Sequence, residues 1–201
     1  MLKRLFDMCL SGFGILISSP LWLLISILII LEDGLPIFYG QERVGKNGRI
    51  FRAMKFRSMI KDAEKDTGPV QATENDPRIT KIGRILRSTA MDELPQLWNI
   101  FIGDMSFVGP RSLRPKEKEV HGSSDEVDIE KVPGYRERLK VRPGLTGIAQ
   151  IYLPTDALRK EKFKYDLHYI ENQSFLLDLK LILLSFWITF RGKWQSREKK
   201  I

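Results

Sequence analysis

The feature that most constrains this chain is an uncharged, apolar run of 24 residues, 8–31, near its N-terminus. Asp7 precedes the run and Glu32 follows it. As a helix, a segment of this length extends about 36 Å, which exceeds the hydrocarbon core of a bilayer, roughly 30 Å thick. The run therefore predicts a membrane helix.

A cleaved signal peptide is the first alternative, because Lys3 and Arg4 give the chain a basic start. The apolar part of a signal peptide is shorter, roughly 7 to 15 residues, and ends at a small-residue cleavage site. No such site precedes Glu32. We therefore interpret the run as a membrane segment of the protein itself.

Pro20 lies near the middle of the run and directly follows Ser18 and Ser19. A proline within a helix lacks an N–H and clashes with the carbonyl four residues earlier, so it kinks the helix. The serine hydroxyls can donate to carbonyls that are freed at the bend. We expect a break in the membrane helix at Ser19 and Pro20.

Basic residues flank the run on both sides. By the positive-inside rule, both ends of the helix are drawn towards the cytoplasm. A re-entrant helix over residues 1–34 satisfies this charge distribution together with the break, and a kinked single span remains the alternative. The flanking residues are Lys3 and Arg4 before the run, and Arg43, Lys46, Arg49 and Arg52 after it.

The remaining residues, 35–201, are enough for one compact catalytic domain. We expect an α+β fold that is mainly helical. With 33 basic and 25 acidic residues, the chain has a net charge of +8, which favours anionic partners such as phospholipids, nucleotides or nucleic acid. Cys9 is the only cysteine, which excludes an internal disulfide and a Cys-x-x-Cys motif.

Turn and helix signals divide this domain into elements. Asn47-Gly48 separates two runs rich in β-branched and aromatic residues, 37–44 and 50–56, and predicts a β-hairpin. A polar loop is expected over 61–75. Apolar residues at helical spacing then predict a helix that includes Ile79, Ile82, Ile85 and Leu86.

A further helix is predicted from Asp92, because Pro95 would then occupy its third position, where the missing N–H costs nothing. Gly103 is its expected end. The heavily charged residues 114–140 are interpreted as a solvated excursion without a core of its own. Another helix is expected from about residue 155 to 170.

Ser174 is a predicted N-cap for a last helix that ends at Phe190. This helix is strongly apolar, but Asp178 and Lys180 interrupt it, so it suits interfacial docking or burial better than a membrane span. A basic tail suited to anionic lipid follows. The tail contains Arg191, Lys193, Arg197, Lys199 and Lys200.

Several familiar catalytic motifs are missing from the sequence. It has no G-x-x-x-x-G-K-[ST] phosphate loop and no G-x-S-x-G nucleophile elbow, and His121 and His168 cannot form a metal site by themselves. The Asp92-Glu93 pair remains. An N-cap aspartate followed by a first-turn glutamate is an ordinary structural arrangement, yet a charged aspartate near arginines is also what a phosphoryl-accepting nucleophile needs.

Three ordered motifs carry a family resemblance: RSTAMDELPQL (87–97), GDMSFVGPR (103–111) and VRPGLTGIAQ (141–150). With KFRSM (55–59) and the Ser19-Pro20 break, they resemble the monotopic phosphoglycosyl transferases, which are bacterial sugar transferases. The resemblance covers nearly the whole chain. It implies a re-entrant helix and an active site on the cytoplasmic face of the bacterial inner membrane.

The resemblance also implies a reaction. Asp92 would attack the β-phosphorus of a UDP-sugar, release UMP and hold the sugar phosphate, which a polyprenyl phosphate such as undecaprenyl phosphate would then accept. Asp92 and Glu93 would work with Mg²⁺. Phosphate contacts would come from Lys55, Arg87, Arg111 and Arg142, whose charges offset repulsion between a carboxylate and a pyrophosphate.

Two departures from the family pattern concern specificity. Ser112 stands where the family often has a second proline, and residues 151–154 replace the frequent Val-Asn-Gly-Arg ending. The second change lies where a sugar or uridine contact is expected. It leaves the mechanism intact and the identity of the sugar open.

Two other functions compete with this one. The first is a membrane-associated glycosyltransferase that transfers only the sugar and releases UDP. The second is a basic protein that binds membrane surfaces or nucleic acid. Because its basic residues do not alternate with aromatic residues as in a stacking platform, no nucleic-acid partner is expected. A homodimer is left open.

Overall fold

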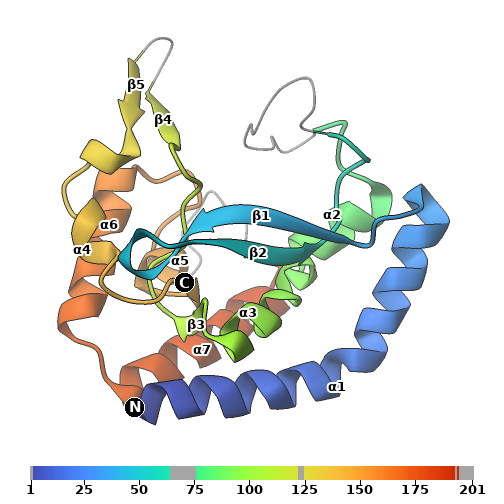
Figure 1. The fold of residues 1–201 in the computed structure, drawn as a ribbon, viewed down its shortest axis with the longest axis horizontal. Coiled ribbons are helices and arrows are strands. Elements are labelled where there is room, and N and C mark those ends of the chain that lie inside the picture. The colour runs from blue at the N-terminus through green and yellow to red at the C-terminus, as the bar shows by residue number, and fades with distance from the viewer. Residues whose placement is uncertain (1, 64–75, 122–124, 193, 195–201) are drawn as a thin grey trace.

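The structure is a computed structural model that describes residues 2–63, 76–121, 125–192 and 194 (Figure 1). It mixes helices and short strands, as predicted for an α+β chain. The helices are α1 (Leu2–Asp33), α2 (Lys81–Ser88), α3 (Gln96–Ile102), α4 (Tyr135–Arg138), α5 (Ile148–Tyr152), α6 (Arg159–Glu171) and α7 (Phe175–Phe190). The strands are β1 (Phe38–Val44), β2 (Ile50–Phe56), β3 (Ser106–Val108), β4 (Lys118–His121), β5 (Asp125–Asp128) and β6 (Gly144–Thr146).

Helix α1 is continuous but bent, and the bend is plain in Figure 1. Pro20 lies inside it and cannot donate to the carbonyl of Leu16, four residues earlier. The Ser19 hydroxyl donates to that carbonyl instead, at 2.8 Å, and Ser18 Oγ donates to the Gly14 carbonyl at 2.6 Å. The predicted role of the serines at the bend is confirmed.

The N-terminal end of α1 is attached to the globular part of the chain. The guanidinium of Arg4 donates to the main-chain carbonyls of Ile100 and Phe101 at the end of α3, both at 2.6 Å. Lys3 forms an ion pair with Asp178 of α7. These contacts fix the first turns of α1 against α3 and α7.

The C-terminal end of α1 is attached to the same globular part. Glu32 accepts hydrogen bonds from the backbone N–H groups of Lys81 and Ile82, at the start of α2, at 2.6 and 2.9 Å. Asp33 pairs with Arg57 at 3.1 Å. Both ends of the bent helix are therefore held by one body, as the curved course of α1 in Figure 1 illustrates.

By length and composition, α1 is the one helix of the described residues that could cross a membrane. Its apolar side chains are largely exposed, including Phe13, Leu16, Leu23 and Leu31. Such a surface indicates membrane association, since a soluble protein rarely exposes so large an apolar patch.

The predicted β-hairpin is confirmed. β1 and β2 pair antiparallel from Phe38 opposite Phe56 to Val44 opposite Ile50. A 3₁₀ turn over Lys46–Gly48 joins them, and Asn47 adopts a φ of 56° there, a conformation that asparagine tolerates better than most residues.

The main core lies between the hairpin, α3, α1 and α7. Asn99 of α3 ties this core to β2, because its side-chain oxygen accepts from Met54 N at 2.9 Å and its amide donates to the Arg52 carbonyl at 2.8 Å. β3 and β6 pair in parallel beside it. Gly109 and Gly144 allow this approach, since a Cβ at Gly144 would lie 2.1 Å from the backbone nitrogen of Gly109.

The interpretation of residues 114–140 as a solvated excursion is wrong. The segment contains β4, β5 and α4, and its buried Ile129 and Val132 form a second small core with Leu113 and Phe163. The apolar residues of the segment have no helical or strand period, and Phe163 comes from distant α6. Sequence periodicity therefore gave no sign of this core.

Several element boundaries follow or depart from the predictions. Helix α3 ends at Gly103, whose φ is 97°, as expected, and Ser174 caps α7 by accepting from Leu177 N. Helix α6 begins at Arg159, later than expected, after a turn at 155–156. Most of the predicted 61–75 loop and the basic tail, apart from Arg191, lie outside the described residues.

Helix α7 is apolar on two faces. Leu181, Ile182 and Ile188 are buried in the main core. The other face is exposed, and a neighbouring exposed set lies on α3. The exposed residues are Phe175, Leu176, Leu179, Leu183, Phe186, Trp187 and Phe190 of α7, with Trp98, Phe101 and Ile102 of α3.

Candidate active site

Asp92 and Glu93 lie in a 3₁₀ turn, Met91–Glu93, and not at the start of an α-helix. Helix α3 begins four residues later, at Gln96, with Pro95 as its N-cap. Without an N–H, Pro95 cannot extend an α-helical ladder that began at Asp92, and i to i+3 bonds form in its place, such as Leu94 N to Met91 O. The α-helix therefore starts later than predicted, and Asp92 lies in the 3₁₀ turn that precedes it.

Side-chain cations supply positive potential at the dyad. Lys55 Nζ lies 2.6 Å from Glu93 Oε1, and Arg111 Nη2 lies 2.9 Å from the same oxygen. Burial alone would raise the pKa of Glu93, but the charges and hydrogen bonds of Arg111 and Lys55 outweigh it and hold that pKa well below its usual value. Glu93 is a carboxylate whose partners are already in place.

Asp92 differs from its neighbour. Its side chain is buried, with the residue only 6% exposed, yet it accepts no hydrogen bond within the described part of the chain. Its nearest cation is Lys55, with Nζ at 3.8 Å from Oδ2. Burial and the adjacent Glu93 charge raise the pKa of Asp92, against the opposing charges of Lys55, Arg87 and Arg111. The Asp92 carboxylate is therefore buried and lies farther from the Lys55 ammonium than the Glu93 carboxylate does.

Strand β2 positions Lys55. The strand register places Lys55 opposite Tyr39. The side chain of Asn99 holds the same strand, because it accepts from Met54 N and donates to the Arg52 carbonyl. Since Asn99 belongs to α3, which directly follows the dyad, the lysine and the carboxylates are carried by elements that are hydrogen-bonded to each other.

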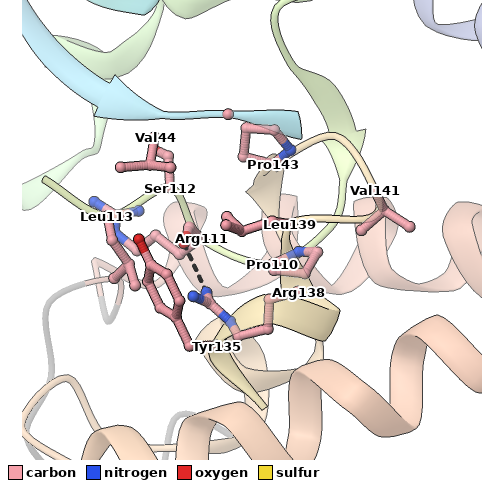
Figure 2. A pocket seen from close by; sticks show the side chains of 11 residues that line it. Val44, Pro110, Arg111, Ser112, Leu113, Tyr135, Arg138, Leu139, Val141 and Pro143 are labelled. Atoms are coloured by element: carbon pink, nitrogen blue, oxygen red, sulfur yellow. Dashed lines mark hydrogen bonds between the residues drawn. The ribbon is translucent and has the colours of Figure 1, made fainter. Parts of the chain in front are cut away.

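Arg138 positions Arg111. It is buried, and its Nη2 donates to the Arg111 carbonyl at 2.8 Å, the dashed line in Figure 2. Its Nε donates to Asp166 of α6 at 2.6 Å, and its guanidinium lies 4.1 Å from the centroid of the Phe163 ring. Burial lowers the pKa of Arg138, and the Asp166 carboxylate compensates its charge.

Arg87 and Arg142 are placed differently from Lys55 and Arg111. Arg87 lies in the last turn of α2 and acts on Asp92 through its charge, without an ion pair to the dyad. Arg142 donates from Nε to the Gly103 carbonyl at 2.8 Å and lines a cavity that does not include Asp92 or Glu93. The structure brings together Asp92, Glu93, Lys55 and Arg111, with Arg87 nearby, but not Arg142.

The two carboxylates of the dyad are a donor set of the kind that would hold a magnesium ion together with a substrate. Mg²⁺ usually keeps several waters and binds one or two carboxylates together with substrate phosphates. Within the described residues, Asp92 and the second oxygen of Glu93 accept no hydrogen bond, so both could contribute a ligand. The described residues contain no group of three or more His, Cys, Asp or Glu side chains suited to a metal, so water and substrate oxygens would have to complete the coordination.

Sequence reasoning missed Asn99, Arg138 and Asp166. Each acts through a partner that is distant along the chain: Asn99 through strand β2, and Arg138 through Asp166 and Arg111. A lone buried asparagine or a charged residue in a charged segment carries no local signal of such a role. Only the fold reveals these pairings.

Comparison with known proteins identifies the class of enzyme to which this fold and this carboxylate site belong. The family model described as bacterial sugar transferase matches residues 1–192. The chain belongs to the bacterial sugar transferase family. It is an enzyme, and its resemblance to the phosphoglycosyl transferases is confirmed.

Individual relatives differ in length and in the sugar that their names specify. The UDP-glucose:undecaprenyl-phosphate glucose-1-phosphate transferase of Klebsiella pneumoniae is 40% identical over 95% of this chain and 40% of its own length. The exopolysaccharide production protein PSS of Rhizobium leguminosarum bv. phaseoli is 41% identical, over 90% of this chain and 91% of its own. The UDP-N-acetylgalactosamine-undecaprenyl-phosphate N-acetylgalactosaminephosphotransferase of Aeromonas hydrophila is 38% identical over 90% of this chain and 42% of its own length. The chain thus spans less than half of two of these relatives.

Proposed function

We propose that this protein transfers a sugar 1-phosphate from a UDP-sugar to a polyprenyl phosphate, undecaprenyl phosphate in bacteria, in two steps through Asp92. The names of the Klebsiella and Aeromonas relatives support the substrates. The name of the Rhizobium relative supports a place in the synthesis of an extracellular polysaccharide. The observation that carries the mechanism is the contrast between Glu93, held by two cations, and Asp92, which is buried and accepts no hydrogen bond from a described residue.

In the first step, an oxygen of the Asp92 carboxylate attacks the β-phosphorus of the UDP-sugar. The bond from that phosphorus to the bridging oxygen breaks, UMP leaves with this oxygen, and the sugar phosphate remains on Asp92 as an acyl phosphate. In the second step, a phosphate oxygen of the polyprenyl phosphate attacks the same phosphorus. The Asp92 carboxylate is restored, and the product is a polyprenyl diphosphate sugar. Splitting the transfer in this way is typical of covalent catalysis.

The residues around Asp92 suit these steps. Lys55 and Arg111 can hold pyrophosphate oxygens while they orient Glu93, and Arg87 adds positive charge nearby. Asp92 and Glu93 would hold Mg²⁺, which would neutralise charge on the pyrophosphate when bound. Raising the pKa of a buried carboxylate also makes it a better nucleophile once it is ionised.

The attachment of α1 supports the membrane placement that we propose. A straight span would put its two ends on opposite sides of the bilayer, whereas here Lys3, Arg4, Glu32 and Asp33 all bind one globular body. This arrangement supports a re-entrant α1 with its break at Ser19 and Pro20, and the basic residues on both sides of the apolar run favour a body on the cytoplasmic face of the inner membrane. The exposed apolar side chains of α3 and α7 dock at the interface.

The mechanism is tested by intact mass measurement of the purified protein in detergent, with Mg²⁺ and a UDP-sugar but without acceptor. UDP-glucose and UDP-N-acetylgalactosamine are the first donors to use, given the names of the relatives. The expected result is release of UMP and a mass increase of one sugar phosphate, located on Asp92. Asp92→Asn removes both, whereas the control Asp156→Asn, at an exposed position, keeps both.

Two outcomes would contradict this function. Release of UDP would indicate an ordinary glycosyltransferase that moves only the sugar. Release of UMP that requires the acceptor, with no adduct under rapid-quench conditions, would indicate direct transfer between the substrates. A homodimer is compatible with either route.

A further inference from the structure

A second cationic site lies apart from the dyad, in a cavity of about 180 Å³. It is bounded by the first turns of α1, the tip of the β1–β2 hairpin, residues 140–142 and Tyr169 of α6. Its volume is several times the roughly 30 Å³ that one water occupies in the liquid. Its basic residues are Lys3, Arg4, Lys46, Lys140 and Arg142, and none of the residues that line it belongs to the dyad cluster.

The fold fixes these cations in place. Asn47 N donates to the Leu139 carbonyl at 2.7 Å, which holds the hairpin tip, and so Lys46, next to Lys140. Arg142 uses Nε to bind the Gly103 carbonyl, so its two terminal nitrogens remain available. Lys46 and Lys140 are exposed at the mouth of the cavity, and neither forms an ion pair with a described residue.

Acidic residues do not neutralise the basic residues of this cavity. Asp178 pairs with Lys3, and Asp7 is the only acid among the lining residues. Asp7 is buried and accepts a hydrogen bond from Phe107 N at 3.2 Å. Arg4, Lys46, Lys140 and Arg142 therefore leave a clear excess of positive charge, which favours an anion.

The position of the cavity on α1 indicates which anion. Lys3, Arg4 and Asp7 come directly before the uncharged run that begins at Met8. The cavity therefore lies where α1 leaves the apolar region, at the level of lipid phosphates. A lipid whose chains lie along the exposed apolar surface of α1 can reach it with its headgroup.

We infer that this cavity binds a phosphate group carried on a membrane lipid, at a site separate from the pyrophosphate site at Asp92. The inference rests on the proposed membrane placement of α1. It gives Arg142, which does not reach the dyad, a phosphate partner of its own. The lipid is an anionic phospholipid or the polyprenyl phosphate, since both present a phosphate on an apolar chain.

The test is a binding titration of the full chain in a neutral detergent, followed by native mass spectrometry. The probes are dioctanoyl phosphatidylglycerol, undecaprenyl phosphate and inorganic phosphate, each added separately. We expect saturable binding of a lipid phosphate, weakened about 5-fold by Lys46→Gln or Lys140→Gln alone and about 25-fold by both. The matched control is Lys160→Gln with Lys164→Gln, which removes the same charge from the exposed face of α6.

The outcomes separate the alternatives. Selective loss in the Lys46 and Lys140 pair, with recovery in Lys46→Arg with Lys140→Arg, supports the site, and the lipid that binds identifies the source of the phosphate. Equal loss in the control pair would indicate diffuse surface charge and overturn it. Inorganic phosphate binding as tightly as the lipids would overturn the lipid origin. The UMP-release assay is independent of these titrations, so its failure would count against the proposed function alone.

Discussion

The buried guanidinium of Arg138 donates a hydrogen bond to the main-chain carbonyl of Arg111, across 2.8 Å. The same Arg111 reaches Glu93 with its side chain, at 2.9 Å. A chain of contacts therefore runs from Asp166 on α6, through Arg138, to the dyad. Arg138 and Asp166 hold the main chain of Arg111 in place. They would act on the proposed reaction only through Arg111.

Arg138→Lys tests this positioning role. A lysine keeps the charge beside Asp166 but cannot also bind the Arg111 carbonyl with a planar fork. The expected result is a fall in kcat of roughly tenfold or more, as for other residues that orient a catalytic group, with an unfolding midpoint close to that of the unchanged protein. An equal fall in thermal stability and activity would instead assign Arg138 a purely structural role. Arg138→Gln is expected to lose about 3–5 kcal/mol of stability, because Asp166 is left buried without a counter-charge.

Lys55→Gln should change the pH dependence of the first step. The carboxylate form of Asp92 attacks phosphorus, so the rate of UMP release rises as pH increases through the raised pKa of this group. The charge of Lys55 opposes that increase in pKa. Removing it raises the pKa further and moves the acid limb of the profile to higher pH. The measurement is rapid-quench release of UMP against pH, and an unmoved limb would contradict the proposed coupling.

Pro20→Ala should straighten α1. The alanine restores an N–H donor to the Leu16 carbonyl, and the Ser19 hydroxyl, now at 2.8 Å from that carbonyl, becomes redundant. A straighter helix cannot keep both ends on one body, so activity in membranes should fall and one end should become accessible to labelling from the opposite side. Ser19→Ala in the presence of Pro20 is the matched control and should keep the topology. Unchanged accessibility in Pro20→Ala would remove the proline as the cause of the bend.

Gly83→Ala should destabilise the attachment of α2. A Cβ at this position would lie 2.0 Å from the Ser58 carbonyl oxygen, which is main chain and cannot move aside. Ser58 follows closely after Lys55, so the strain is close to the strand that carries Lys55. Overpacking of this kind costs about 1–3 kcal/mol, roughly 2–12 °C in melting temperature for a chain of this size. Arg84→Ala, at an exposed position of the same helix, should stay within about 0.5 kcal/mol.

Local signals predicted the parts of the fold that local chemistry determines. The Asn47-Gly48 turn, the Gly103 end of α3, the Ser174 cap and the serine hydroxyls at Pro20 each depend on neighbours within a few residues, and the structure has all four. The position of Asp92 was mistaken, because a proline can either begin a helix or, as Pro95 does, stand just before it. The local sequence around Pro95 is compatible with both positions.

The parts that could not be predicted depend on contacts between distant residues. Arg138 and Asp166 are 28 residues apart, and Asn99 bonds to a strand 45 and 47 residues earlier. The motifs predicted which residues gather at the dyad, since Lys55 and Arg111 contact Glu93. The motifs did not show that Arg142 lies apart from the dyad. Its cavity is lined partly by residues of α1, which are distant from it in the sequence.

The pairing of Lys3 with Asp178, together with the edge-on contact of Phe6 and Phe175, has a consequence for biosynthesis. Helix α1 meets Asp178 only after 175 further residues, counted from Lys3, have been made. Contacts so distant in sequence form late. If α1 enters the bilayer as proposed, lipid is available to its apolar side chains before α7 exists to pack against them.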